Sequence, residues 1–283
     1  MTTEMPSLPS YEKDVLDEAK RAPDRGAFDE EAEAGSDPLE DAYFNYLVRL
    51  GDDSLILGQR LGEWCGHAPV LEVDLSLANL ALDLIGQATH LLGHANNDDA
   101  DDLAFHRDVL DFKNCLLVEQ PNGDFARTMA RQLLFSTWQH MLYRDLTDSP
   151  DKFLREFAAK AVKEVAYHRE LASDWTIRLG DGTDESAGRM AEGLDWCWRF
   201  VPELFEVDDC LEEMIARQTV PDPRTFESEY YAAIEAVLGE AQLALPPDQR
   251  PILGGRRGHH SEHLGHLLAQ MQYLPRTYPD AVW

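Results

Sequence analysis

Residues 49–95 constrain the fold of this chain more than any other segment. Their apolar residues recur at intervals of three and four, which places them on one face of an α-helix. Gly66 and Pro69 interrupt this spacing, so the segment predicts two long helices joined by a turn at residues 65–69. We expect the second helix to run from about residue 71 to 95, and we predict that one face carries Leu75, Ala78, Leu82, Ile85 and Thr89.

The helical spacing begins at Pro38 and continues through the rest of the chain. An acidic turn at 96–102 leads into a shorter helix that is predicted to end at about residue 117. Further helices are predicted at 125–146, 150–179, 184–200, 203–218, 223–240 and 259–274. Valine and isoleucine do not alternate as they would in strands. The sequence therefore predicts an all-α antiparallel bundle with extra short helices over residues 38–283. Residues 1–37 are polar and acidic, which is typical of a flexible extension.

The chain is strongly acidic, with 25 basic and 53 acidic residues and a net charge of −28. Such a surface repels nucleic acids and anionic membranes, so neither is an expected partner. Lysine is scarce among the basic residues, and the acidic excess extends along the whole chain. This composition favours adaptation to high salt, where charges are screened within roughly 3 Å. An ordinary acidic protein is the alternative.

The four cysteines lack the spacing of a zinc ribbon or a disulfide framework, so we expect small buried thiols. No apolar run reaches the ~18 residues of a transmembrane helix. The N-terminus has neither the basic flank nor the apolar core of a secretory signal. By elimination, we expect a cytoplasmic protein.

Carboxylates interrupt the apolar pattern of the first two helices, at Asp52, Asp53, Glu63, Asp74 and Asp83. A di-iron helical bundle places its ligands in this way, with one Glu from each of two helices and Glu-x-x-His from each of the other two. The spacing of three directs both side chains to one helix face. A complete iron site would therefore require acid–histidine pairs at this spacing.

None of the ten histidines follows an acidic residue at that spacing, so the complete motif is absent. Asp83 is followed three residues later by Gly86, and Glu164 is followed by Tyr167 and then His168. A helical rotation of about 100° separates Tyr167 from His168, so His168 would address a different face. We expect no complete metal site here, only degenerate ligand positions whose side chains form hydrogen bonds between helices: Glu63, Asp83, Glu164 and His168.

A second group of histidines lies near the C-terminus. On a helix, His259, His263 and His266 would share one face, as would Glu262 and His266. The group follows a glycine-rich loop, so we favour a surface or interface role over metal binding. The sequence contains no P-loop, dinucleotide-binding or serine-nucleophile motif.

Four stretches identify a family. The run GDDSLILGQRLGEWCGHAPVLEVDLSLANLALDLIGQA resembles the C-type structural subunit of phenylacetyl-CoA 1,2-epoxidases, as do AKAVKEVAYHRELASDWTIRLGDGTDES, RMAEGLDWCWRF and HHSEHLGHLLAQMQYLPRTYPDAVW. The resemblance covers about residues 38–283. It implies a ferritin-like fold and a structural subunit without a cofactor of its own.

The same resemblance implies partners. In this family the di-iron site and the epoxidation of the aromatic ring belong to the A subunit, a reductase subunit supplies electrons, and the C-type chain pairs tightly with the A subunit. Four aromatic residues are candidates for that contact, with core packing as the alternative: Trp196, Trp198, Phe200 and Phe205. Two other functions remain open, a ferritin-like binding protein of another pathway and a self-sufficient di-iron oxygenase that uses the four degenerate positions, Glu63, Asp83, Glu164 and His168.

Overall fold

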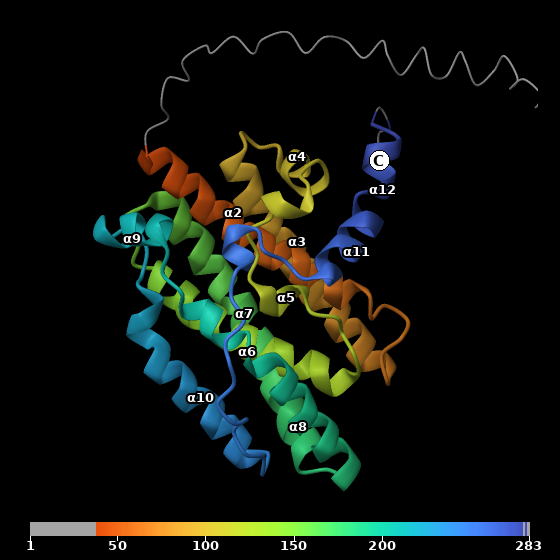
Figure 1. The fold of residues 1–283 in the computed structure, drawn as a ribbon. Coiled ribbons are helices and arrows are strands. Elements are labelled where there is room, and N and C mark those ends of the chain that lie inside the picture. The colour runs from red at the N-terminus through yellow and green to blue at the C-terminus, as the bar shows by residue number, and fades with distance from the viewer. Residues whose placement is uncertain (1–37, 280, 282–283) are drawn as a thin grey trace, which may run out of the picture. The chain divides into compact units, whose positions relative to one another are not determined.

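The computed structural model describes residues 38–279 and 281, and the predicted N-terminal extension lies outside them. Within this range the secondary structure is entirely helical, as the sequence predicts (Figure 1). The elements are α2 (Pro38–Gly62), α3 (Leu71–Ala95), α4 (Ala100–Phe105), η2 (Val109–Asp111), α5 (Leu116–Glu119), α6 (Phe125–Leu146), α7 (Lys152–Gly180), α8 (Asp184–Trp198), η3 (Val201–Phe205), α9 (Asp209–Ala216), η4 (Pro223–Phe226), α10 (Glu227–Glu240), η5 (Gly255–Arg257), α11 (Glu262–Met271) and α12 (Tyr273–Thr277).

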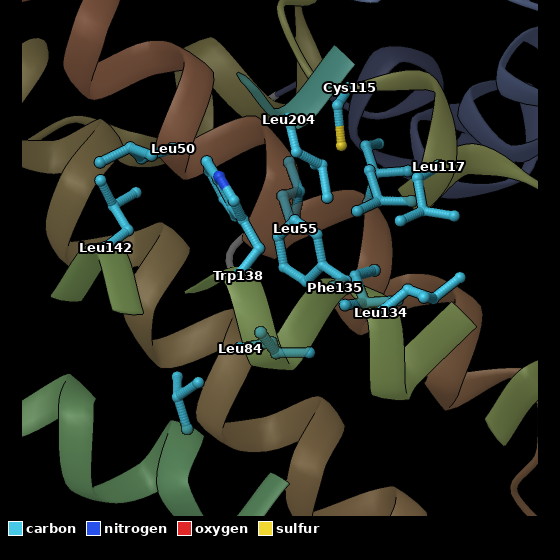
Figure 2. Packing of buried hydrophobic residues seen from close by; sticks show 14 of the residues in the cluster. Leu50, Leu55, Leu84, Cys115, Leu117, Leu134, Phe135, Trp138, Leu142 and Leu204 are labelled. Atoms are coloured by element: carbon cyan, nitrogen blue, oxygen red, sulfur yellow. The ribbon is translucent and has the colours of Figure 1, made fainter. Parts of the chain in front are cut away.

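Two helical hairpins form the bundle, with α2 packed along α3 and α6 packed along α7. Two glycines on α2 allow the first pair to approach closely: a Cβ at Gly51 would lie 2.6 Å from Leu92, and one at Gly58 would lie 3.0 Å from Ile85. Helix α6 is buried around most of its circumference, which is typical of a central helix. The core between the hairpins is apolar over much of its length, as Figure 2 shows around Leu84 and Phe135.

Aspartate and threonine side chains define where several helices begin. The carboxylates of Asp124, Asp151 and Asp208 each accept a hydrogen bond from the backbone N–H three residues later, and the Thr183 hydroxyl does the same. Each bond satisfies one of the free N–H groups of a first helical turn and contributes about 1 kcal/mol. The predicted helices at 71–95 and 125–146 are confirmed at both ends.

The helix predicted to continue to residue 117 is wrong. The chain forms α4 and η2, then runs without helix to α5. The cause lies on α2, where Asp52 accepts a hydrogen bond from the Lys113 N–H at 2.8 Å and Asp53 accepts one from the Cys115 N–H at 2.7 Å. These carboxylates, noted in the sequence as possible ligands, instead hold an extended segment against α2.

Two other predicted helices are also divided. The one at 203–218 ends early in η3 and restarts as α9, because the Asp208 carboxylate caps a new first turn. The one at 259–274 begins only at Glu262 and breaks at Gln272 between α11 and α12.

The predicted face of α3 is the outward one in this chain. Leu75 and Leu82 are 57% and 69% exposed, whereas Leu77, Leu80 and Leu84 are fully buried. Leucines occupy both faces at helical spacing, so the periodicity is consistent with either orientation. The helix therefore buries one apolar face in the bundle and leaves a second uncovered.

The four aromatic residues considered for partner contact pack mainly within the chain. Phe200 and Phe205 are 6% and 7% exposed and belong to the core, so the core-packing alternative holds for them. Trp198 is partly buried and packs edge-on against Tyr231, and Trp196 lies beneath the Arg127 guanidinium.

Candidate functional site

Polar side chains project into the interior of the bundle from all four long helices. Helix α6 contributes most of them, at spacings of three and four that share one face. All of them are buried except Glu164, whose side chain is 23% exposed, and most of the surrounding positions are apolar. We call this set the polar core, and its members are Ser54, Gln87, Gln132, Ser136, Gln139, Tyr143, Glu164 and His168.

A chain of hydrogen bonds crosses the polar core from α6 to α7. The Gln139 side-chain amide donates to the Tyr143 hydroxyl at 3.1 Å and to the Gln87 carbonyl oxygen at 3.3 Å. The Gln87 amide in turn donates to the Glu164 carboxylate at 3.0 Å. Burial raises the pKa of Tyr143, so its phenol stays protonated. This series of hydrogen bonds ends at the carboxyl group of Glu164.

Several other atoms of the polar core have no hydrogen-bond partner among the described protein atoms. On α6 and α7 these are both ends of the Gln132 amide, the Ser136 hydroxyl, Oε1 of Gln139 and Nδ1 of His168. Unpaired polar groups in a protein interior cost stability. Their grouping on the inward faces of α6 and α7 sets this region apart from the apolar core.

Three of the four degenerate positions lie between α3 and α7. Nε2 of His168 lies 3.1 Å from Oδ2 of Asp83, and Glu164 is bonded to Gln87. His168 is fully buried and Tyr167 is 46% exposed, so the histidine one residue beyond the motif position is the one that faces inward. These residues form hydrogen bonds between helices, as the sequence predicts.

Glu63 lies apart from the other three. It follows the end of α2, pairs with Arg60 at 2.7 Å and accepts a hydrogen bond from Asn122 at 2.9 Å. The structure therefore separates the predicted set into one surface-facing carboxylate and a group of three.

A cavity of about 280 Å3 lies in the groove between α3 and α7. Phe153, Phe157 and Ala161 form its apolar wall, and Gln87 and Glu164 link it to the polar core. Lys160 lies at its rim, 3.7 Å from Glu164.

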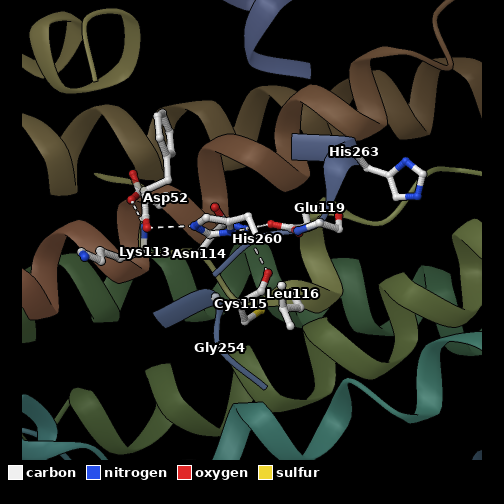
Figure 3. Close-up of polar contacts among 12 residues, drawn as sticks. Asp52, Lys113, Asn114, Cys115, Leu116, Glu119, Gly254, His260 and His263 are labelled. Carbon is white, nitrogen blue, oxygen red and sulfur yellow. Dashed lines mark hydrogen bonds and ion pairs between the residues drawn. The ribbon is translucent and has the colours of Figure 1, made fainter. Parts of the chain in front are cut away.

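The C-terminal histidines are arranged differently from the helical face predicted for them. His260 is the buried one, and it contacts Glu119 and the Phe112 carbonyl oxygen (Figure 3). The residues predicted to share a face, His259, His263 and His266, do not gather with acidic residues: over the described part of the chain, no three His, Cys, Asp or Glu side chains are placed to hold a metal ion. Sequence spacing gave no signal for the Glu119–His260 pair, because 141 positions separate its members.

Two comparisons with known proteins indicate the same family for this chain. The family model for phenylacetic acid catabolic proteins, which covers A-type and C-type chains together, matches residues 24–283. The C-type subunit of 1,2-phenylacetyl-CoA epoxidase from Escherichia coli (strain K12) is 47% identical over 242 residues, covering 84% of this chain and 98% of that protein.

The chain belongs to the phenylacetic acid catabolic protein family. Its all-helical bundle is the ferritin-like fold of that family, which confirms the fold expected from the sequence. The family match begins at residue 24, upstream of the boundary at residue 38 that the sequence motifs indicate.

The polar core does not fit the di-iron pair of a ferritin-like oxygenase. Such a site needs about six ligands, chiefly carboxylates and imidazoles, on facing helices. In this member of the phenylacetic acid catabolic family, the polar core consists mostly of neutral amides and hydroxyls, among them Gln87, Gln132, Ser136 and Gln139. Asp83 and Glu164 enter separate hydrogen bonds, and Glu63 is remote. The arrangement can hold a hydrogen-bonded network but lacks the negative charge that would offset two metal ions.

Among the described residues, no helix has both the length and the apolar character needed to cross a membrane.

Proposed function

We propose that this chain is the structural subunit of a phenylacetyl-CoA 1,2-epoxidase and pairs with the catalytic A subunit, which holds the di-iron site. The observation that carries the proposal is a helical bundle with an incomplete iron-ligand motif, in a chain 47% identical to a C-type subunit of this enzyme. In this proposal the chain itself binds no metal, and the partner subunit carries out the epoxidation of the aromatic ring. Because acyl-CoA thioesters are cytoplasmic metabolites, the proposal also places the chain in the cytoplasm.

The outward face of α3 supports a partner contact. Leu71, Leu75 and Leu82 are between 57% and 69% exposed and repeat at intervals of four and seven, so they form one stripe along the helix. Ala78 lies on the same stripe, whereas Ile85 at its edge is partly buried against the core. Solvent-exposed apolar patches of this kind mark interfaces in soluble proteins. We propose that the stripe packs against a helix of the A subunit.

Co-expression with the A subunit tests this proposal. The variant Leu75→Glu/Leu82→Glu places charge on the stripe without altering the buried face of α3. Burying a leucine contributes about 1.5 kcal/mol or more, so losing two would weaken pairing roughly 100-fold. Leu110→Glu is the matched control, since this leucine is 72% exposed but lies in η2.

Two results would contradict the proposal at different levels. If the wild-type chain fails to co-purify with an A subunit, the pairing itself is wrong. If the double variant pairs as tightly as the wild type and the Leu110 control, the pairing stands but the α3 stripe is not its contact surface.

A further inference from the structure

Residues 254–261 form a strap that crosses the bundle between η3 and α11, with buried polar contacts at its start and partly buried ones at its end (Figures 1 and 3). At its start, the backbone N–H groups of Gly254 and Gly255 donate to one carboxylate oxygen of Glu203 at 2.8 and 2.7 Å. The Arg256 side chain then enters the core and pairs with Asp53 at 2.8 Å. These contacts fix the first half of the strap to η3 and α2.

A single imidazole fixes the second half. Nδ1 of His260 lies 2.7 Å from a carboxylate oxygen of Glu119, and Nε2 lies 2.9 Å from the carbonyl oxygen of Phe112 (Figure 3). Both side chains of the His260–Glu119 pair are fully buried. The next residue, Ser261, donates its backbone N–H to the other oxygen of Glu119 at 2.6 Å.

The geometry assigns the protonation state of His260. A carbonyl oxygen can only accept, so Nε2 must carry a hydrogen. Both oxygens of Glu119 already act as acceptors, for the Asn114 amide and the Ser261 N–H. Nδ1 must then also donate, so the bonded form is the imidazolium. A neutral imidazole has one donor and would leave a buried acceptor without its hydrogen.

The surrounding charges support the imidazolium. On α2, the negative charge of Asp52 favours the imidazolium of His260, although Asp52 is also paired with Arg107. Arg60, also on α2, donates to the backbone oxygens of Glu119 and of His263 on α11. Lys113 contacts Asp52 through its backbone N–H. Burial lowers the pKa of His260, but the hydrogen bond to Glu119, the charge of Glu119 and the Phe112 carbonyl raise it more, so the net pKa is above its ordinary value.

We propose that the strap is a proton-dependent latch, closed while His260 is an imidazolium and loosened when that ring loses its proton. Since the folded state holds the proton more tightly than the unfolded state, the stabilisation is complete below the ordinary histidine pKa of about 6.5. It is lost as the pH rises through the higher pKa of the folded state. Loosening affects residues 254–261 and the adjoining start of α11, while α6 remains packed.

Hydrogen exchange of the full chain tests the latch. The reporters are the backbone amides of Gly254, Gly255 and Ser261, corrected for intrinsic exchange at each pH between about 6 and about 9, with α6 amides as internal reference. We expect protection of the strap amides to fall across this range while α6 protection is constant. The variant His260→Gln should raise strap exchange by roughly 10- to 100-fold at pH 6 and remove its pH dependence, since it lacks the charge-assisted bond.

His266→Gln is the matched control, because His266 lies on α11 and is exposed. It should behave as the wild type does. The latch is overturned if wild-type strap protection is independent of pH, or if His260→Gln is as protected as the wild type at pH 6. Should His260→Gln not fold, the pH series on the wild-type chain and on the His266 variant decides the question alone.

Discussion

Replacing Arg256 by methionine removes one half of a buried ion pair and should destabilise the chain severely. The Arg256 and Asp53 side chains are 7% and 2% exposed, and the charged atoms lie 2.8 Å apart. Arg256 also donates to the backbone oxygens of Arg49 and Lys113, at 3.2 and 3.1 Å. Methionine fills a similar volume but leaves these acceptors and the carboxylate without their partner.

The expected loss follows from what remains buried. Asp53 keeps the Cys115 N–H at 2.7 Å, and burial, which already raises the pKa of its carboxyl, is then no longer opposed by Arg256. An uncompensated buried charge costs about 3–5 kcal/mol, a large part of the roughly 5–15 kcal/mol of a typical domain. Asp53→Asn/Arg256→Met removes both charges, so its loss should be smaller than the sum of the two single losses by at least about 1 kcal/mol.

Urea denaturation followed by circular dichroism measures these differences. Arg189→Met is the control, because Arg189 pairs with Glu185 at the surface, where the side chains are 55% and 75% exposed, and such pairs contribute little. A loss below about 1 kcal/mol for Arg256→Met, or losses that simply add in the double variant, would refute the reasoning that this pair anchors the strap to α2.

Three further predictions concern packing, thiols and salt. Gly255→Ala should lower the free energy of unfolding in urea by about 1–3 kcal/mol, because a Cβ there would meet the backbone of Asn114 and Leu116, which cannot move aside. Gly188→Ala is the control, since nothing lies within 4 Å of a Cβ at that position, and equal stabilities of the two variants would contradict the expectation. An aromatic disulfide reagent should label the exposed thiol of Cys65 first. Cys115 and Cys197 should react only on unfolding, since both are buried and burial raises the pKa of Cys197 to about 12. Simultaneous labelling of all four thiols would be inconsistent with the fold. We also propose adaptation to salt, so thermal unfolding should shift upward from dilute buffer to molar KCl, and a midpoint indifferent to KCl would rule this out.

The sequence predicts the long helices of this fold well because their signals are local. The breaks before α6 and the aspartate at its first turn are visible in the chain itself, and α6 begins and ends where predicted. The split between α4 and α5 is not visible, because it depends on Asp52 and Asp53 of α2, which bond to backbone about 60 positions away. A local pattern carries no information about such a partner.

The candidate site shows the same division. Counting residues between acids and histidines predicts that the iron motif is incomplete. The contacts that link α3 and α7 through Asp83, Glu164 and His168 come from the structure. The orientation of α3 could not be predicted, since Leu75 and Leu77 both belong to apolar helical stripes and only packing selects which is buried. The burial of His260 could not be predicted either, because its partner, Glu119, is remote in sequence.

Metal analysis of the purified chain alone, and of its complex with the A subunit, distinguishes an iron-free partner from a chain that binds iron itself. For an iron-free partner, we expect iron and oxygen consumption to accompany the A subunit. The isolated chain, loaded with ferrous iron and then desalted, should retain no iron and consume no oxygen. A stoichiometric pair of irons on the isolated chain, with oxygen consumption in the absence of the A subunit, would contradict it.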